Sequence, residues 1–110
     1  MARYLSTIGV TPEGFKGLIE NPQNRKEGVG PLFAAIGGTL EHYWLGVGEN
    51  KFYVVFTTPD DDITLEALSM VVYSSGIADS FQSSRILTAE EGMQAAQKAA
   101  ELTYRPPAGG

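Results

Sequence analysis

The segment from Gly38 to Pro59, GTLEHYWLGVGENKFYVVFTTP, decides the fold of this chain. It contains two runs rich in β-branched and aromatic residues, and a glycine-rich turn at Gly46-Val47-Gly48 joins them. Apolar residues occupy every position of the second run from Phe52 to Phe56, so both faces of that strand are apolar. We therefore predict a β-hairpin of two central strands that serve both the core and a contact with another copy.

The residues before this hairpin predict one strand followed by helix. Ala2 to Val10 is a strand candidate with apolar residues on both faces. Thr11-Pro12-Glu13 is typical of a helix start, and Asn21-Pro22 interrupts that helix. Helical spacing then resumes, although Gly28 to Pro31 predicts a kink or a loop within it. The residues that carry the resumed spacing are Val29, Leu32, Phe33 and Ile36.

After the hairpin, Asp60-Asp61-Asp62 is better explained as a helix start than as a metal site. Three successive acids cannot all face one ion on a regular element, whereas acids before an apolar run cap a helix and complement its dipole. We predict a helix from Asp61 to Tyr73. Its buried positions are predicted to be Ile63, Ala67, Met70 and Val71.

The C-terminal part predicts a fourth strand and a last helix. Ile77 to Leu87 forms the strand candidate, with Phe81, Ser83, Arg85 and Leu87 on one side. Thr88-Ala89-Glu90-Glu91 is a capping box, which opens a helix from Ala89 to about Leu102 with a stripe of Met93, Ala96 and Ala100. We expect one domain over residues 1–103 and an extended or flexible tail over residues 104–110.

The order of elements, βαββαβ with an extra C-terminal helix, predicts an α+β fold with a four-stranded antiparallel sheet of the ferredoxin-like kind. Right-handed crossovers place the connecting helices on one face of that sheet. The other face then exposes apolar residues, and such a face is typical of an interface. We therefore predict a homodimer through the sheet face, and the pattern leaves a larger oligomer open.

Composition narrows the classes of function. The chain has 110 residues, a formal net charge of −5 and no Cys, which excludes disulfides and thiolate sites. Because phosphate backbones are held by clustered cations, which this sequence lacks, we expect no nucleic-acid partner and no contact with an anionic membrane surface. We also expect no metal and no other cofactor, and a cytoplasmic location, since no apolar run is long enough for a membrane helix.

Several short motifs follow one another along the chain in a characteristic order. They are Arg3-Tyr4-Leu5, Thr11-Pro12-Glu13-Gly14, Gly37-Gly38-Thr39-Leu40, Tyr43-Trp44-Leu45-Gly46-Val47-Gly48, Pro59-Asp60-Asp61, and Arg85 followed by Thr88-Ala89-Glu90-Glu91. These motifs resemble those of the GYD-domain family, small proteins of the dimeric α/β-barrel superfamily. The resemblance covers roughly residues 2 to 100 and implies the dimeric ferredoxin-like fold, without implying an activity. The Gly of the family signature stands at Gly48, whereas its Tyr and Asp positions fall on Asn50 and Lys51.

Two functional hypotheses follow. In the first, the protein is a dimeric small-molecule-binding or auxiliary module with a pocket for a small apolar ligand inside each copy. Four aromatic residues would line that pocket: Tyr43, Trp44, Phe52 and Tyr53. The alternative for these side chains is simple core packing, which is the common role of aromatic residues.

In the second hypothesis, the protein is a cofactor-independent enzyme, like monooxygenases or isomerases of the same superfamily. His42, the only His, would act as the base, because its pKa lies near neutrality. Arg85 or Asn50 would stabilise an oxyanion, and Tyr43 and Trp44 would stack on a flat apolar or aromatic substrate. The structural alternatives are a hydrogen-bonded His42 and an ion pair of Arg85 with Asp79, Glu49 or the last helix.

Overall fold

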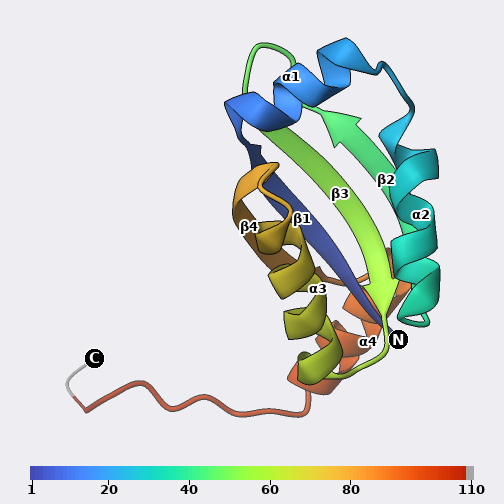
Figure 1. Ribbon diagram of the computed structural model, residues 1–110. Coiled ribbons are helices and arrows are strands. Elements are labelled where there is room, and N and C mark those ends of the chain that lie inside the picture. The colour runs from blue at the N-terminus through green and yellow to red at the C-terminus, as the bar shows by residue number, and fades with distance from the viewer. Residues whose placement is uncertain (109–110) are drawn as a thin grey trace.

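The computed structural model describes residues 1–108, in which four antiparallel strands form one sheet and helices cover one of its faces (Figure 1). This is the mixed α+β, ferredoxin-like arrangement that the order of elements predicts. In chain order the elements are β1 (Ala2–Val10), α1 (Pro12–Glu20), α2 (Arg25–Ala35), β2 (Thr39–Leu45), β3 (Lys51–Thr58), α3 (Asp62–Ser74), β4 (Ala78–Ile86) and α4 (Ala89–Ala99).

The strand order in the sheet is β2-β3-β1-β4. β1 therefore lies between β3 and β4, and only β3 of the hairpin is a central strand. The prediction that both hairpin strands are central is wrong for β2, which is an edge strand. The turn between them contains Gly48 at φ +79°, a conformation that glycine adopts without strain.

The connection from β1 to β2 consists of two helices. The hydroxyl of Thr11 accepts a hydrogen bond from the Gly14 N–H at 3.2 Å and so caps α1, which ends before Asn21 as predicted. Helix α2 begins after Asn24 and continues without interruption across Pro31. Of the kink or loop expected around Gly28 to Pro31, the loop is therefore wrong, because the packing of this helix on the sheet outweighs the local cost of proline.

Phe56 of β3 is the centre of the core and has no exposed surface. Its ring lies 4.9 Å from that of Phe33 in α2 and 5.7 Å from that of Tyr4 in β1. The Phe33 pair joins the sheet to its helical layer, and the Tyr4 pair joins β3 to β1. The other buried members of the cluster are Leu40, Val54 and Leu68.

Helix α3 turns a different side to the sheet than the sequence predicts. Asp61 caps it as expected, and its carboxylate accepts from the Ile63 N–H at 3.0 Å. The side chain that α3 buries is Leu68, whereas Ile63 is 82% exposed and Met70 is 65% exposed. The helix carries two apolar stripes, and sequence spacing alone could not identify the one that faces the core. All four predicted positions, Ile63, Ala67, Met70 and Val71, are exposed.

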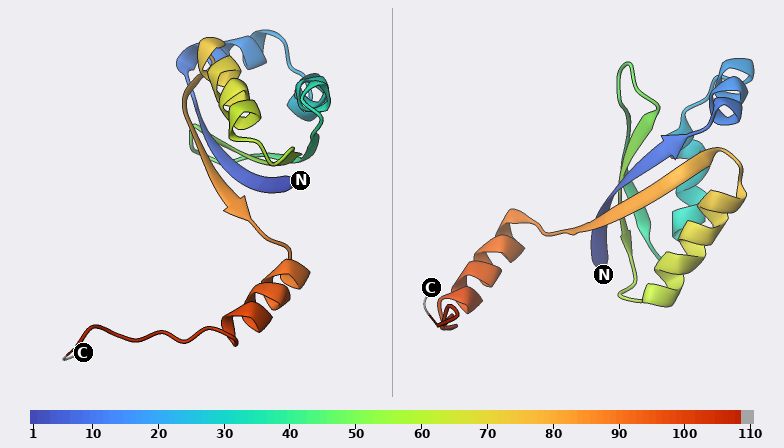
Figure 2. Two further views of the ribbon diagram at one scale, coloured as in Figure 1. Left: turned by 90° about the horizontal axis from the view of Figure 1, so that it is seen from below. Right: turned by 90° about the vertical axis from the view of Figure 1, so that its left-hand side faces the viewer.

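Helix α4 extends away from the rest of the chain, as Figure 2 shows. Its capping box is present, with the Glu91 N–H donating to the Thr88 hydroxyl at 3.1 Å, but it ends at Ala99 and buries no residue. The radius of gyration is 17.9 Å, whereas a compact chain of this length has about 13 Å. Residues 104–108 form neither helix nor strand; Gly109 and Gly110 of the predicted tail lie outside the described residues.

Candidate functional site

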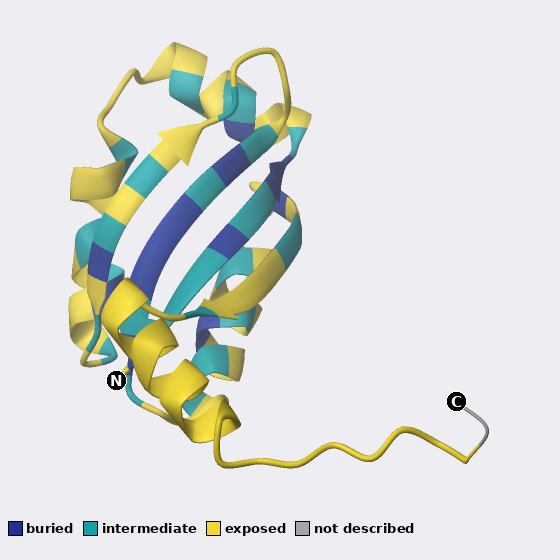
Figure 3. Ribbon diagram, turned by 180° about the vertical axis from the view of Figure 1, so that it is seen from behind, coloured by how far each residue is buried: buried dark blue, intermediate teal, exposed yellow. Residues whose placement is uncertain are grey.

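The hairpin side chains divide between two faces of the sheet. Tyr43 pairs with Val54, whose side chain is in the core, so both belong to the face that the helices cover. His42 pairs with Val55 and belongs to the opposite, open face, which Figure 3 presents to the viewer. A register shift at Glu41, between Leu40 and His42, precedes this alternation.

A cavity of about 420 Å³ lies between the covered face and the helices α1, α2 and α3. Its wall is apolar over most of its extent, and every strand of the sheet contributes to it. The apolar side chains of the wall are those of Ile8, Val10, Leu18, Val29, Leu32, Tyr43, Phe52, Val71, Val72, Ile77 and Ala78.

Phe52 holds the sheet side of this cavity in place. Its ring meets that of Phe15 from α1 edge-on, with centroids 5.8 Å apart, and that of Tyr43 at 5.7 Å and 63°. Edge-to-face pairs of this kind are the preferred geometry of aromatic rings. The aromatic wall is therefore fixed by contacts from both α1 and β2.

Two glycines shape the helical side of the cavity. A Cβ atom at Gly14 would lie 2.9 Å from a methyl carbon of Val10, so the absence of a side chain lets α1 approach β1. Gly17, one turn further along α1, also lines the cavity, and a Cβ there would meet no atom within 4 Å. A larger side chain at Gly17 would therefore extend into open space beside the cavity.

Arg25 and Tyr43 bring polar groups to this apolar cavity. The half-buried Arg25 donates from Nη1 to Oε1 of Gln23 at 2.9 Å. Burial raises the pKa of the Tyr43 phenol, and the nearby Arg25 opposes this rise. The phenol therefore stays protonated at neutral pH and can donate a hydrogen bond.

The open face carries the other two aromatic residues that were expected in a pocket. Trp44 stacks on His42 with ring centroids 4.6 Å apart and planes 12° apart. Tyr53, paired with Trp44 across the strands, donates from its hydroxyl to Glu49 at 2.6 Å, and this bond raises the pKa of Tyr53. Of the four predicted lining residues, Tyr43 and Phe52 line the cavity, whereas Trp44 and Tyr53 lie on the other side of the sheet.

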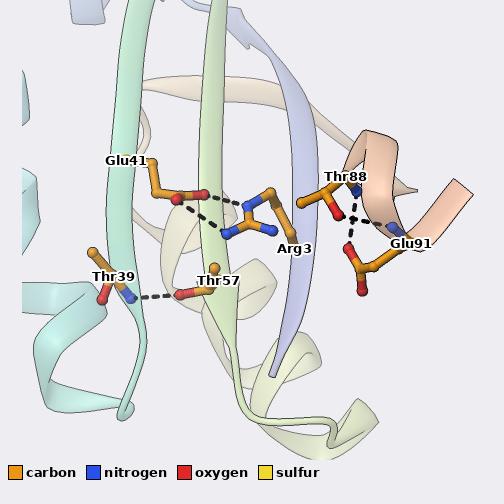
Figure 4. Close-up of polar contacts among 6 residues, drawn as sticks. All are labelled: Arg3, Thr39, Glu41, Thr57, Thr88 and Glu91. Atoms are coloured by element: carbon orange, nitrogen blue, oxygen red, sulfur yellow. Dashed lines mark hydrogen bonds and ion pairs between the residues drawn. The ribbon is translucent and has the colours of Figure 1, made fainter. Parts of the chain in front are cut away.

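Arg3 and Glu41 form an ion pair across β1, β3 and β2 on this open face (Figure 4). Arg3 Nε donates to one carboxylate oxygen at 2.6 Å and Nη2 to the other at 3.2 Å. The bidentate bond lowers the pKa of Glu41. Glu41, the residue at the register shift of β2, is thus held by a bidentate contact with Arg3 of β1.

The three candidate catalytic residues lie in three different places. Arg85 forms an ion pair with Asp60 at 3.2 Å and lies 6.0 Å from the Tyr4 ring, at the β4 edge of the sheet. Asn50 lies in the hairpin turn, where its backbone carbonyl accepts from the Val10 N–H at 2.9 Å. His42 lies on the open face, so one chain does not bring these groups together.

Sequence reasoning missed Arg25 as a site residue, and it missed the contribution of α1. The usable signal was the pair of helices in one crossover, since the inward side of each had to face the same strands. Gly17 of α1 and Gly28 of α2 line the cavity, and their lack of a side chain leaves space on its helical side.

Within residues 1–108, no group of three or more His, Cys, Asp or Glu residues is arranged to hold a metal ion. No helix of the described chain is both long enough and apolar enough to cross a membrane.

A family model describes most of this chain. The GYD domain matches residues 4–96, which include all the cavity residues and most of α4. The chain belongs to the GYD domain family. Comparison of this GYD domain with curated proteins and with solved structures gave no match.

Proposed function

We propose that this GYD domain protein is a homodimeric small-molecule-binding module, in which each protomer holds a small apolar ligand between its sheet and its helices. The observation that carries this proposal is the cavity of about 420 Å³. Ligand pockets typically measure roughly 300–1,000 Å³ and combine an apolar wall with a few polar groups. The cavity has both properties.

Two features support the homodimer. Trp44 on the open face is 53% exposed, and the neighbouring Leu5, Val55 and Ile86 make this side of the sheet apolar. Helix α4 carries an apolar stripe that its own chain does not cover. A second copy that meets the first across the open faces would cover the aromatic residues, and α4 is placed to extend onto it.

The enzymatic alternative, with His42 as base, receives less support. His42 lies on the opposite face of the sheet from the cavity, and its ring is stacked on Trp44. Arg85 is paired with Asp60, and Asn50 lies in the turn. A base needs an oxyanion-stabilising group and a substrate within reach, and His42, Arg85 and Asn50 do not converge within one chain.

A substitution at the wall of the cavity tests the proposal. We expect Gly17→Leu to place a side chain beside the cavity and to abolish saturable binding of octanol, a neutral apolar probe, in isothermal titration calorimetry. Gly30→Leu is the matched control, because Gly30 is also helical, has open space around its Cβ position, and does not line the cavity. This control should bind octanol like the unsubstituted protein.

Either of two results would overturn the proposal. The first is no saturable octanol binding to the unsubstituted protein. The second is equal octanol affinity in Gly17→Leu and Gly30→Leu, which would place the bound octanol elsewhere.

A further inference from the structure

We propose that the ligand of this cavity is an amphiphilic carboxylate, with its apolar part against the cavity wall and its carboxylate bound by Arg25 and Tyr43. This inference rests on the proposed binding function and names the chemical class of the ligand. It depends on what each of the two polar groups lacks within the protein.

Arg25 lines the apolar cavity and is hydrogen-bonded there to a neutral partner. The ion pairs among residues 1–108 use Arg3, Arg85 and the amino terminus, whereas the recorded partner of Arg25 is the amide oxygen of Gln23. A guanidinium has five N–H donors, and this bond uses one of them. A half-buried cation beside an apolar wall loses hydration, which an anion would compensate.

The protein has 13 Asp and Glu residues against 8 Lys and Arg, so acidic partners for an arginine are abundant. None of the acids in the described part of the chain lies within ion-pair distance of Arg25. The guanidinium is therefore left for a carboxylate that arrives with the ligand.

Tyr43 supplies a second donor from a different element. Its phenol lines the same cavity as Arg25, and the ring is held by its contact with Phe52. Burial keeps the phenol in its protonated form, which donates to an anion. A carboxylate has two oxygens, so the guanidinium and the phenol can each bind one of them.

One guanidinium and one neutral phenol suit a single negative charge. A phosphate monoester carries up to two charges and three acceptor oxygens, which these two groups would satisfy only in part. A cationic head group would be repelled by Arg25. The geometry therefore favours a carboxylate over both alternatives.

The test compares octanoate, octanol and octylammonium, which share the same alkyl chain, by isothermal titration calorimetry. We expect octanoate to bind most tightly and octylammonium most weakly. Arg25→Met should weaken octanoate binding by about tenfold to a hundredfold, the usual worth of a charged hydrogen bond, and leave octanol binding almost unchanged. Lys26→Met is the matched control, since it removes the same charge from the adjacent, exposed position.

Tyr43→Phe is a second variant, which removes the phenolic hydroxyl and keeps the ring. It should weaken octanoate binding by a smaller factor than Arg25→Met does, again without affecting octanol. Circular dichroism checks that each variant is folded.

Separate outcomes distinguish this inference from the proposed function. Equal affinities for octanoate and octanol, or equal losses in Arg25→Met and Lys26→Met, would overturn the carboxylate site and leave the apolar pocket intact. Tighter binding of octyl phosphate than of octanoate would also overturn it. If the unsubstituted protein binds neither octanol nor octanoate, the two proposals are overturned together.

Discussion

The two faces of the sheet differ in what covers them, although the same strands build both. Val54 and Val55 are neighbours on β3, and each exposes less than a tenth of its surface. Val54 belongs to the core cluster under the helices, whereas Val55 belongs to the open face beside His42. The alternation of side chains along a strand thus separates the proposed ligand-binding surface from the proposed surface for a second copy.

The largest expected effect is on the open face. Val55→Glu should weaken dimerisation by roughly a hundredfold or more, because two carboxylates would be buried across the interface without partners. Sedimentation velocity at micromolar concentration would then show the monomer in place of the dimer.

Val47→Glu is the control for this prediction. Val47 lies in the hairpin turn and is fully exposed, so the same substitution there adds the charge outside both faces. If Val55→Glu and Val47→Glu both sediment as dimers, like the unsubstituted protein, the open face is not the interface.

A second pair of variants compares the faces through stability. Val54→Ala should lower the free energy of unfolding by about 2 kcal/mol, because the substitution removes two buried methyl groups and leaves a cavity in the core. Val55→Ala should also cost packing within the protomer, because Val55 is buried in the single chain. Since Val55 also lies on the face of the proposed dimer, its effect on the melting temperature should depend more strongly on protein concentration. Thermal unfolding at several concentrations measures both, and the same concentration dependence in the two losses would contradict the assignment of the faces.

The smallest effect concerns the ion pair on the open face. The bidentate bond from Arg3 lowers the pKa of Glu41 below its ordinary value of 4.5. Its contribution to stability is therefore fully present above about pH 4.5 and is lost as the pH falls through the lowered pKa. In urea titrations between about pH 5 and pH 3, Glu41→Gln should lose less stability than the unsubstituted protein.

Asp61 and Glu91 provide the internal comparison for this acid titration. Hydrogen bonds from Thr64 and Thr88 lower their pKa values, so part of the acid sensitivity should survive in Glu41→Gln. An unchanged pH profile in that variant would mean that the bond from Arg3 contributes nothing measurable to folding.

Local signals in the sequence predicted most of the fold. The hydroxyl caps at Thr11 and Thr88 and the acidic cap at Asp61 each identified the start of a helix, because capping depends on residues only a few positions apart. β1 has the predicted bounds, Ala2–Val10, because the residues that favour a strand also follow one another directly in the chain. Short-range chemistry was sufficient for these elements.

The candidate site depended on contacts that the sequence does not contain. Tyr43 and Trp44 are adjacent and equally aromatic, and the register of β2 on β3 places only Tyr43 at the cavity. Arg25 follows a helix break and has no motif, yet the packing of α1 and α2 on one face brings it to Tyr43. The arrangement of the three helices over the sheet was needed to show that Arg25 and Tyr43 line the same cavity.

Native mass spectrometry of the unsubstituted protein with octanoate tests the central claim most directly. If the covered face binds the ligand and the open face binds a second copy, the main species should be a dimer with two octanoate molecules, one for each protomer. A monomer with bound octanoate would contradict the role of the open face. A dimer with a single octanoate would contradict the cavity, because it would place the ligand between the two sheets.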